Sequence, residues 1–145
     1  NMNESNSILS PMREAIASQD ADGVEDALNQ AFGAGLTADL VPTLIELIEL
    51  PWHTRHEDVV LALQELKPPD AAQALRRAAA VTHEYLDYDE FFGLARKCTW
   101  ALADIGTLEA QAALRELAAV ENESIAGYAQ KRLDNWDEEK HRKGI

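Results

Sequence analysis

The sequence has little cysteine and no long apolar run. Its single cysteine, Cys98, excludes a disulfide within the chain, and no apolar stretch approaches the roughly 20 residues that a helix needs to cross a bilayer. The stretch NMNESNSILSPMREA lacks the basic segment and apolar core of a secretory signal. We therefore expect a cytoplasmic protein that spans no membrane.

The motifs of common catalytic and cofactor-binding sites are also missing. The chain contains no G-x-G-x-x-G, no P-loop and no glycine-rich turn before a helix that could cradle a phosphate. No spacing of Ser, His and Asp suggests a nucleophilic site. Cys98 falls at a predicted core position, where a thiol behaves as a small hydrophobic group and its pKa is not lowered. We expect a protein without enzymatic activity and without a cofactor.

Basic residues are scarce relative to acidic ones, 13 against 26, and the formal net charge is −13. The excess is concentrated in residues 1–50, which hold nine acids and one base, Arg13. Such a charge repels nucleic acid and anionic lipid, and it speeds association with a basic protein. It is equally expected of a surface that only keeps a protein soluble. The charge favours a basic protein as partner over nucleic acid or a membrane.

What the sequence does contain is the pattern of an all-helical chain. Its 145 residues, of which 46% are hydrophobic, suit one globular domain, and stop and start signals divide it into about eight helices of roughly 10 to 18 residues. Ser10-Pro11 is predicted to open the first helix. Three pairs have the spacing of a capping box: Asp22 with Glu25, Thr54 with Glu57, and Asp87 with Glu90. Gly33-Ala34-Gly35 and Gly106 are predicted to end helices with positive φ angles.

The predicted helices belong to an internal repeat. ALQELKPPDAAQALR (62–76) aligns without a gap with ALADIGTLEAQAALR (101–115), so that one constant offset relates every pair of positions. Two core positions align through four copies: Val24, Val59, Cys98 and Ala129 at one, and Leu28, Leu63, Leu102 and Leu133 four residues later. Because an amphipathic helix pair cannot bury its apolar face alone, the repeat predicts a stack of pairs with one continuous core.

These repeats resemble a known family, the HEAT-like helical repeats, particularly the short bacterial kind. The resemblance is carried by SIAGYAQKRL (124–133), by WALADIG (100–106) followed by an Ala/Leu-rich helix, and by the loop lengths. It implies an all-α, right-handed α-solenoid in which one domain, residues 1–145, consists of four helical hairpins at about 7–35, 36–67, 68–106 and 107–145. Since such solenoids mostly serve as binding scaffolds, the resemblance says more about fold than about function.

Histidines offer the only candidate metal ligands. His53 and His56 form an H-x-x-H pair, and the His56-Glu57 dipeptide within TRHEDVVLAL is similar to the iron-binding His-Glu pairs of deoxyhypusine hydroxylase, a HEAT-like enzyme. The second dipeptide, His83-Glu84, is predicted near the end of a first helix, where that family places no ligand. Two isolated dipeptides do not supply the several convergent ligands of a non-haem iron site, so no metal site is expected. The capping box with Thr54 explains Glu57 without a metal.

The stretch THEYLDYDEFFG (82–93) is the strongest candidate for a partner-binding surface. It forms an extended corner between two helices, too short for all of its aromatic side chains to point inward. Phe92, and Tyr85 with it, are expected to join the core, which leaves Tyr88 and one other Phe exposed. Tyr side chains beside carboxylates are typical of interfaces that bind Arg and Lys. The predicted partner-binding residues are Trp52, Glu84, Tyr85, Asp87, Tyr88, Asp89 and Glu90.

The C-terminal segment is predicted to be an exposed helix. Its bases alternate with acids, which is typical of a solvated helix laced with ion pairs: Lys131, Arg132, Lys140, Arg142 and Lys143 lie among Asp134, Asp137, Glu138 and Glu139. Trp100 and Trp136 are expected to pack between hairpins.

Together these features favour a non-enzymatic binding protein. Small acidic solenoids of this type resemble the immunity proteins of bacterial competition systems, which bind a toxin domain and block its active site. That resemblance implies a monomer that binds a cognate basic toxin domain. Two alternatives remain open: a HEAT-like enzyme or accessory subunit, similar to the metal-dependent hydroxylase or to the phycobilin lyases, and a structural adaptor in a larger complex.

Overall fold

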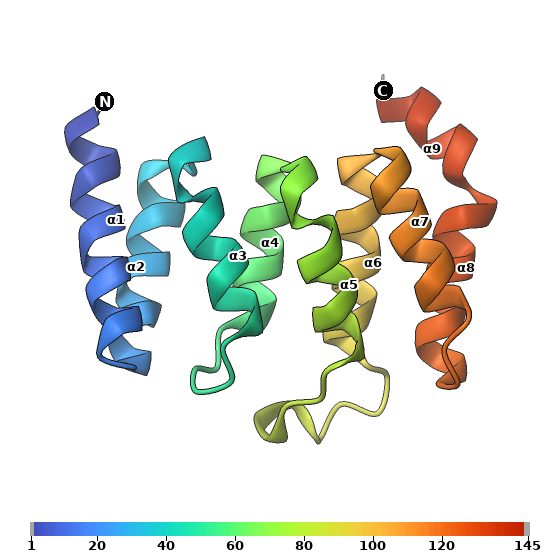
Figure 1. Ribbon diagram of the computed structural model, residues 1–145, viewed down its shortest axis with the longest axis horizontal. Helices are drawn as coiled ribbons and strands as arrows, with labels where there is room; N and C mark the ends of the chain where they lie inside the picture. Colours follow the sequence, from blue (N-terminus) through green and yellow to red (C-terminus); the bar gives the residue numbers. More distant parts are fainter. Residues whose placement is uncertain (1, 144–145) are drawn as a thin grey trace.

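The computed structural model describes the backbone of residues 2–143 and the burial of residues 8–141. Over this part of the chain it contains nine α-helices and no strand, which confirms the all-α prediction (Figure 1). The helices are α1 (Met2–Ala17), α2 (Ala21–Ala34), α3 (Val41–Glu49), α4 (His56–Leu66), α5 (Ala72–Ala80), α6 (Gly93–Ile105), α7 (Leu108–Ala118), α8 (Glu123–Asp134) and α9 (Trp136–Lys143). Short 3-10 helices lie at η1 (Ala38–Leu40), η2 (Pro69–Ala71) and η3 (Glu84–Leu86).

Consecutive helices form antiparallel pairs: α1 with α2, α3 with α4, α5 with α6, and α7 with α8 (Figure 1). Helices α1, α3, α5 and α7 also contact one another in chain order, as do α2, α4, α6 and α8, so the pairs form two layers. The loops within the pairs lie along the lower edge in Figure 1, which we call the corner edge; they span residues 18–20, 50–55, 81–92 and 119–122.

The core lies between the two layers, at the positions that the repeat aligns. Val24, Val59, Cys98 and Ala129 come from α2, α4, α6 and α8, and each is 0% exposed. The leucines four residues later are buried in the first three copies, and Leu133 is half-buried against the same core. The burial predicted from the repeat is confirmed.

Equivalent repeat positions also end their helices alike. Lys67 closes α4 with a φ of 53°, and Gly106, its counterpart in the following repeat, closes α6 with a φ of 71°. Their N–H groups donate to the carbonyls of Leu63 and Leu102, which the repeat also aligns with each other. A left-handed lysine costs about 1–2 kcal/mol relative to glycine, so tertiary packing holds Lys67 in a conformation that its own side chain disfavours.

The predicted starts of the helices are wrong in most cases. Helix α1 begins at Met2 and contains Pro11 in its interior, where proline removes one backbone hydrogen bond and crowds the preceding turn. Helix α2 is capped by Asp20 rather than Asp22: the Asp20 carboxylate accepts the Gly23 N–H at 3.0 Å. Helix α4 follows Arg55 without any side-chain cap, so the Thr54–Glu57 capping box does not form. The Asp87–Glu90 box is absent too, since α6 begins only at Gly93.

Charged side chains join neighbouring pairs within each layer. Arg77 of α5 pairs with Glu49 of α3, and Arg76 of α5 pairs with Glu116 of α7 at 3.1 Å. In the other layer Lys97 of α6 pairs with Glu57 of α4 at 3.0 Å. Each exposed ion pair stabilises the fold by about 0–1 kcal/mol. These ion pairs therefore favour the packing of particular helix pairs beside each other more than they add to the overall stability. Glu57, expected to cap a helix, forms one of these links because its partner lies one pair away.

The C-terminal segment differs from its prediction. A kink at Asn135 separates α8 from α9, and Arg132 and Glu139, on either side of it, form a buried ion pair at 2.8 Å. The Arg132 guanidinium lies 3.5 Å from the centroid of the Trp100 ring, and Trp136 is buried. Arg132 is therefore part of the core rather than of a solvated helix. The sequence could not show this because alternating charges give the same pattern whether or not one of them is covered by a neighbouring helix.

None of the helices in the described residues combines the length and the apolar character needed to cross a membrane.

Two glycines at the end of α2 provide a test of the backbone geometry. A Cβ at Gly33 or at Gly35 would meet nothing within 4 Å, but only Gly35 has a positive φ, of 96°. We expect Gly35→Ala to lower the free energy of unfolding by about 1–3 kcal/mol, because Ala is strained at this φ. Gly33→Ala is expected to raise it by about 0.5–1 kcal/mol, because Ala favours the helix. Urea unfolding measures both changes, and effects of equal sign would contradict the assigned end of α2.

Candidate functional site

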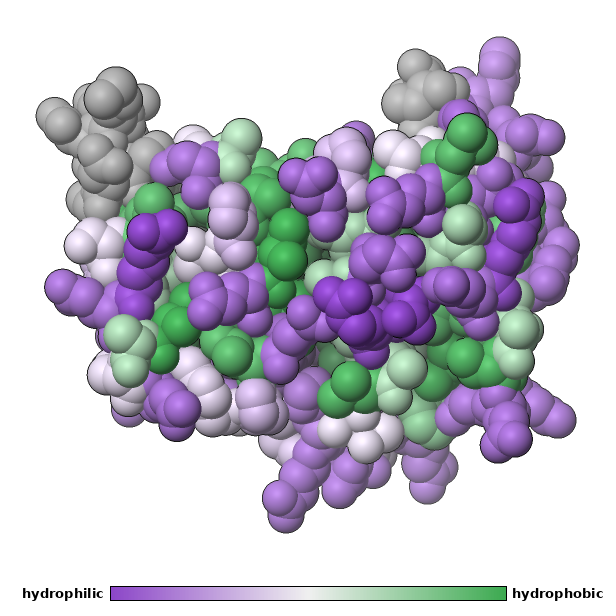
Figure 2. All heavy atoms as spheres, in the orientation of Figure 1, coloured by the Kyte–Doolittle hydropathy of each residue, from purple (hydrophilic) through white to green (hydrophobic). Residues whose placement is uncertain are grey.

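The loop 81–92, between α5 and α6, exposes most of the large hydrophobic side chains found at the surface. Three of the five that are exposed in the described residues lie there: Val81 at 52%, Tyr88 at 79% and Phe91 at 75%. Figure 2 shows hydrophilic side chains projecting from the lower edge where this loop lies. The expectation that Tyr88 and one Phe remain at the surface is confirmed.

The remaining predicted partner-binding residues divide between surface and interior. Glu84, Asp87 and Glu90 are exposed, and Asp89 is half-buried. Tyr85 is also half-buried and faces the α3–α4 corner, where its hydroxyl contacts His56. Trp52 packs partly into the core from the same corner. The surface that a partner can reach is thus centred on Asp87, Tyr88, Glu90 and Phe91.

A row of rings joins the α3–α4 corner to the loop 81–92. The rings of His53 and His56 stack with centroids 4.0 Å apart, and His56 stacks on His83 at 3.8 Å. Trp52 meets His53 edge-on at 5.7 Å, and Tyr85 lies 5.7 Å from His56. His83 was expected near the end of a helix, but α5 ends at Ala80 and the loop returns His83 to His56. We call His53, His56, His83 and Tyr85 the histidine row.

The hydrogen bonds of His53 require a neutral imidazole, and those of His56 fit one. His53 Nε2 lies 2.7 Å from the Leu47 carbonyl and must donate, while His53 Nδ1 accepts the Arg55 N–H at 3.0 Å. His56 Nε2 likewise donates to the Leu50 carbonyl at 2.7 Å. The Tyr85 hydroxyl lies 2.7 Å from His56 Nδ1 and accepts the His56 N–H at 3.3 Å. In the neutral tautomer that has its proton on Nε2, every one of these groups has a partner.

Burial lowers the pKa of each histidine in the row. Loss of hydration lowers the pKa of His56 to about 4, although the hydrogen bond to Leu50 opposes the shift and His53 and His83 add to it. The same desolvation lowers the pKa of His53 and of His83. Desolvation also raises the pKa of Tyr85 to about 12. The row is neutral at pH 7.

The histidine row does not fit a metal ion. Both ring nitrogens of His53 and of His56 already have protein partners, and Glu57 pairs with Lys97. No group of three or more His, Cys, Asp or Glu side chains in the described residues could hold a metal. The His-x-x-His spacing that resembles a pair of metal ligands instead places His53 and His56 in a stack of rings.

A strained turn in the loop 81–92 positions Phe92. Phe92 has a φ of 54°, a left-handed conformation that costs about 1–2 kcal/mol in a residue other than glycine. The Asp89 carboxylate holds the turn by accepting the N–H groups of Phe91 at 2.9 Å and Gly93 at 2.8 Å. A Cβ at Gly93 would lie 2.6 Å from this carboxylate, so a larger residue there would displace the Asp89 side chain. Tyr128 of α8 donates to the Phe91 carbonyl at 2.5 Å, which ties the turn to the next pair.

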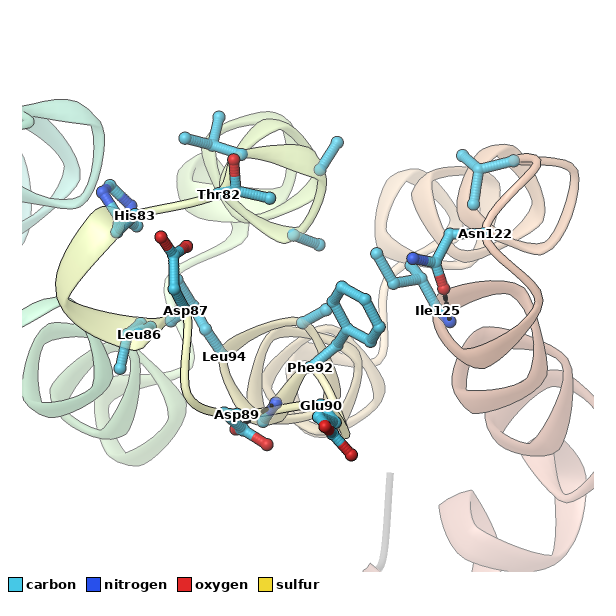
Figure 3. A pocket seen from close by; sticks show the side chains of 16 residues that line it. Thr82, His83, Leu86, Asp87, Asp89, Glu90, Phe92, Leu94, Asn122 and Ile125 are labelled. Atoms are coloured by element: carbon cyan, nitrogen blue, oxygen red, sulfur yellow. Dashed lines mark hydrogen bonds between the residues drawn. The ribbon is translucent and has the colours of Figure 1, made fainter.

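Beside this turn lies an open pocket of about 520 Å³ (Figure 3). It is bounded by the end of α5, the loop 81–92, the start of α6 and the α7–α8 corner. In Figure 3 the Phe92 ring points across it toward Ile125 and Asn122, opposite Thr82 and His83. The pocket and the exposed aromatics adjoin on the corner edge. Sequence reasoning missed the pocket, because its far wall, Val120, Asn122 and Ile125, comes from a later helix pair of the chain.

The single cysteine of the sequence lies in the core. Cys98 is fully buried, and desolvation raises the pKa of its thiol to about 12. Such a thiol is unreactive at neutral pH.

Comparisons with models of protein families, with curated proteins and with solved structures give no match. The resemblance to HEAT-like repeats and to immunity proteins therefore rests on the residues of this chain alone.

Removal of one hydroxyl tests the histidine row. We expect Tyr85→Phe to lower the free energy of unfolding by about 1–3 kcal/mol, because the N–H and Nδ1 of His56 lose a shared partner in a buried setting. Tyr88→Phe is the matched control; its side chain is exposed, so its effect should lie within about 0.5 kcal/mol. Urea unfolding at pH 7 measures both, and equal effects would contradict the role of the Tyr85 hydroxyl.

The row also predicts a loss of stability in weak acid. Its histidines have lower pKa values in the folded chain than in the unfolded chain. Their contribution to the free energy of unfolding is therefore complete above the unfolded pKa of about 6.5. It is lost as the pH falls towards about 4, the pKa of His56 in the folded chain. Below pH 6.5 the unfolded chain takes up protons that the folded chain does not. The free energy of unfolding therefore decreases as the pH falls, by as much as about 1.4 kcal/mol per pH unit for each histidine.

Unfolding measured between pH 7 and 5, where most carboxylates stay ionised, gives the slope of the free energy of unfolding against pH. We expect His83→Gln to reduce the slope. A slope that His83→Gln does not alter would contradict the assignment of His83 to the row.

Proposed function

We propose that the chain is a non-enzymatic protein-binding scaffold, a HEAT-like α-solenoid that grips a basic protein through its corner edge. The observation that carries the proposal is the loop 81–92, which exposes Tyr88 and Phe91 beside the free carboxylates of Asp87 and Glu90. Exposed aromatics among carboxylates are the composition of an interface aimed at Lys and Arg.

The distribution of ion pairs supports a basic partner. Arg55, Arg76, Arg77, Lys97 and Arg132 are engaged in ion pairs with acids of the same chain. Since acids outnumber bases by 26 to 13, many carboxylates remain without a basic partner. The resulting field would draw a cationic domain to the surface from a distance.

The way the loop 81–92 is held suits a partner that is bound and not chemically converted. The histidine row and the bond from Tyr128 to Phe91 fix the loop 81–92 to both neighbouring pairs, so its aromatics are held in place before a partner arrives. Pre-organised groups lose less freedom on binding. In the more specific form of the proposal, the chain is an immunity protein whose acidic loop occupies the cationic substrate site of a toxin domain.

Two other functions have less support. A metal-dependent hydroxylase needs open histidine nitrogens, and those of His53 and His56 are engaged. A structural adaptor needs no acidic surface, so salt-insensitive capture of a neutral partner would favour it. Metal or pigment retained on purification would favour the enzyme or lyase class.

Charge reversal in the loop tests the proposal. We expect Asp87→Lys/Glu90→Lys to slow association with a basic partner by about tenfold or more at low salt and to weaken its salt dependence, because the steering charge changes sign. The measurement is capture of proteins from a lysate of the source organism at low and high salt, identification by mass spectrometry, and association kinetics with the captured partner.

The matched control reverses two exposed acids on the opposite edge, Glu65→Lys/Asp70→Lys, and should change the rate far less. Equal effects of the two double variants would show that only total charge matters and would remove the loop from the binding surface. For the immunity form, co-expression should rescue cells from a toxin encoded beside this gene, and absence of rescue would contradict it.

A further inference from the structure

The pocket beside the loop 81–92 has apolar walls and an acidic rim. Its walls are mainly apolar, with Val81, Leu86, Phe92, Leu94, Val120 and Ile125 among them. Its rim carries the carboxylates of Asp87, Asp89 and Glu90, and no Lys or Arg lines it. Figure 3 shows Asp89 and Glu90 together on one side of the opening. An apolar cavity with acids at its mouth is complementary to an apolar group beside a positive charge.

Two of the three rim acids are free for a partner. Asp89 is occupied, since its two oxygens accept the N–H groups of Phe91 and Gly93. The side chains of Asp87 and Glu90 are exposed and form no hydrogen bond or ion pair with other described residues. Two bases at the start of α6 have other partners: Lys97 pairs with Glu57, and the guanidinium of Arg96 lies over the Tyr128 ring.

We propose that this pocket holds one apolar side chain of the partner, leucine or phenylalanine in size, flanked in the partner by Lys or Arg that pair with Asp87 and Glu90. A cavity of about 520 Å³ is large enough for such a side chain with its adjoining backbone. The inference rests on the proposed function and names the part of the partner that anchors it. A buried anchor surrounded by charge pairs at the rim is the usual composition of an interface hot spot.

Charge excludes a second copy of this chain as the occupant. Among the exposed apolar side chains that another copy could insert, Tyr88 and Phe91 are themselves flanked by Asp87, Asp89 and Glu90, and Leu108 precedes Glu109. Insertion would bring acids against an acidic rim, between two molecules that each carry a net charge of −13. A basic segment meets no such repulsion.

Short peptides test the proposed anchor directly, with the full chain isotopically labelled and observed by NMR. Three peptides of the same length carry Arg-Phe-Arg, Arg-Ala-Arg or Glu-Phe-Glu at their centre. We expect Arg-Phe-Arg to shift the signals of Leu94, Val120 and Ile125 saturably, and Arg-Ala-Arg to bind about tenfold more weakly or worse, because the pocket loses its apolar occupant. Glu-Phe-Glu should produce no shift.

A pocket-filling variant provides the control within the protein. Ala80 lines the pocket but is exposed at the end of α5, so Ala80→Leu fills the space without disturbing the core. We expect it to abolish the Arg-Phe-Arg shifts. Ala112→Leu makes the same change at an exposed alanine of α7 outside the pocket and should preserve them.

Four outcomes would overturn the inference. These are no shift with Arg-Phe-Arg, equal binding of Glu-Phe-Glu, equal binding of Arg-Ala-Arg, and shifts of the same signals with protein concentration alone, which would indicate a second copy. The test is separable from that of the function itself. If Ala80→Leu still captures the basic partner while Asp87→Lys/Glu90→Lys does not, the binding surface stands and the pocket is not its anchor.

Discussion

Burial of each helix pair against the next is the interaction on which the rest of the structure depends. One pair by itself would leave an apolar face in water, and positions such as Val59 and Cys98 are fully buried only because neighbouring pairs stand on both sides. The exposed ion pairs between pairs contribute too little to replace this burial. Because the packing between pairs holds the structure together, the loops at the edges can differ in length. The α3–α4 loop spans residues 50–55, and the α5–α6 loop spans residues 81–92.

The longer of these loops is tied into the scaffold by contacts of two kinds. On one side, neutral imidazoles of the histidine row stack between the α3–α4 corner and the loop. On the other, Asp89 and Tyr128 hold the strained turn at Phe92 against α8. The strain at Phe92 persists because these contacts over-determine the turn, an arrangement common at binding sites. Acids and aromatics therefore lie at the corner edge, next to the pocket, on a loop that contacts both neighbouring helix pairs.

Several features were predictable because they depend on neighbours in sequence. Helical periodicity and the constant offset between the repeats locate the buried positions, and the shortness of the corner places Tyr88 and a Phe at the surface. Cap positions were less predictable. Asp22, Thr54 and Asp87 have suitable spacing, yet Glu57 pairs with Lys97 of the next helix pair, and α4 starts without a side-chain cap. A local preference of about 1 kcal/mol is easily overridden by contacts between pairs.

By itself, the sequence determined the helical class, the core positions of the repeat and the excess of acid, since each follows from composition or from spacing within a helix. Only the tertiary structure decided which polar residues meet. His56 contacts Tyr85 across 29 positions and Tyr128 contacts Phe91 across 37, while Arg132 is buried between Trp100 and Glu139. The physical reason is that these contacts depend on how whole pairs pack, and side-chain spacing along one helix carries no information about the distance to the next.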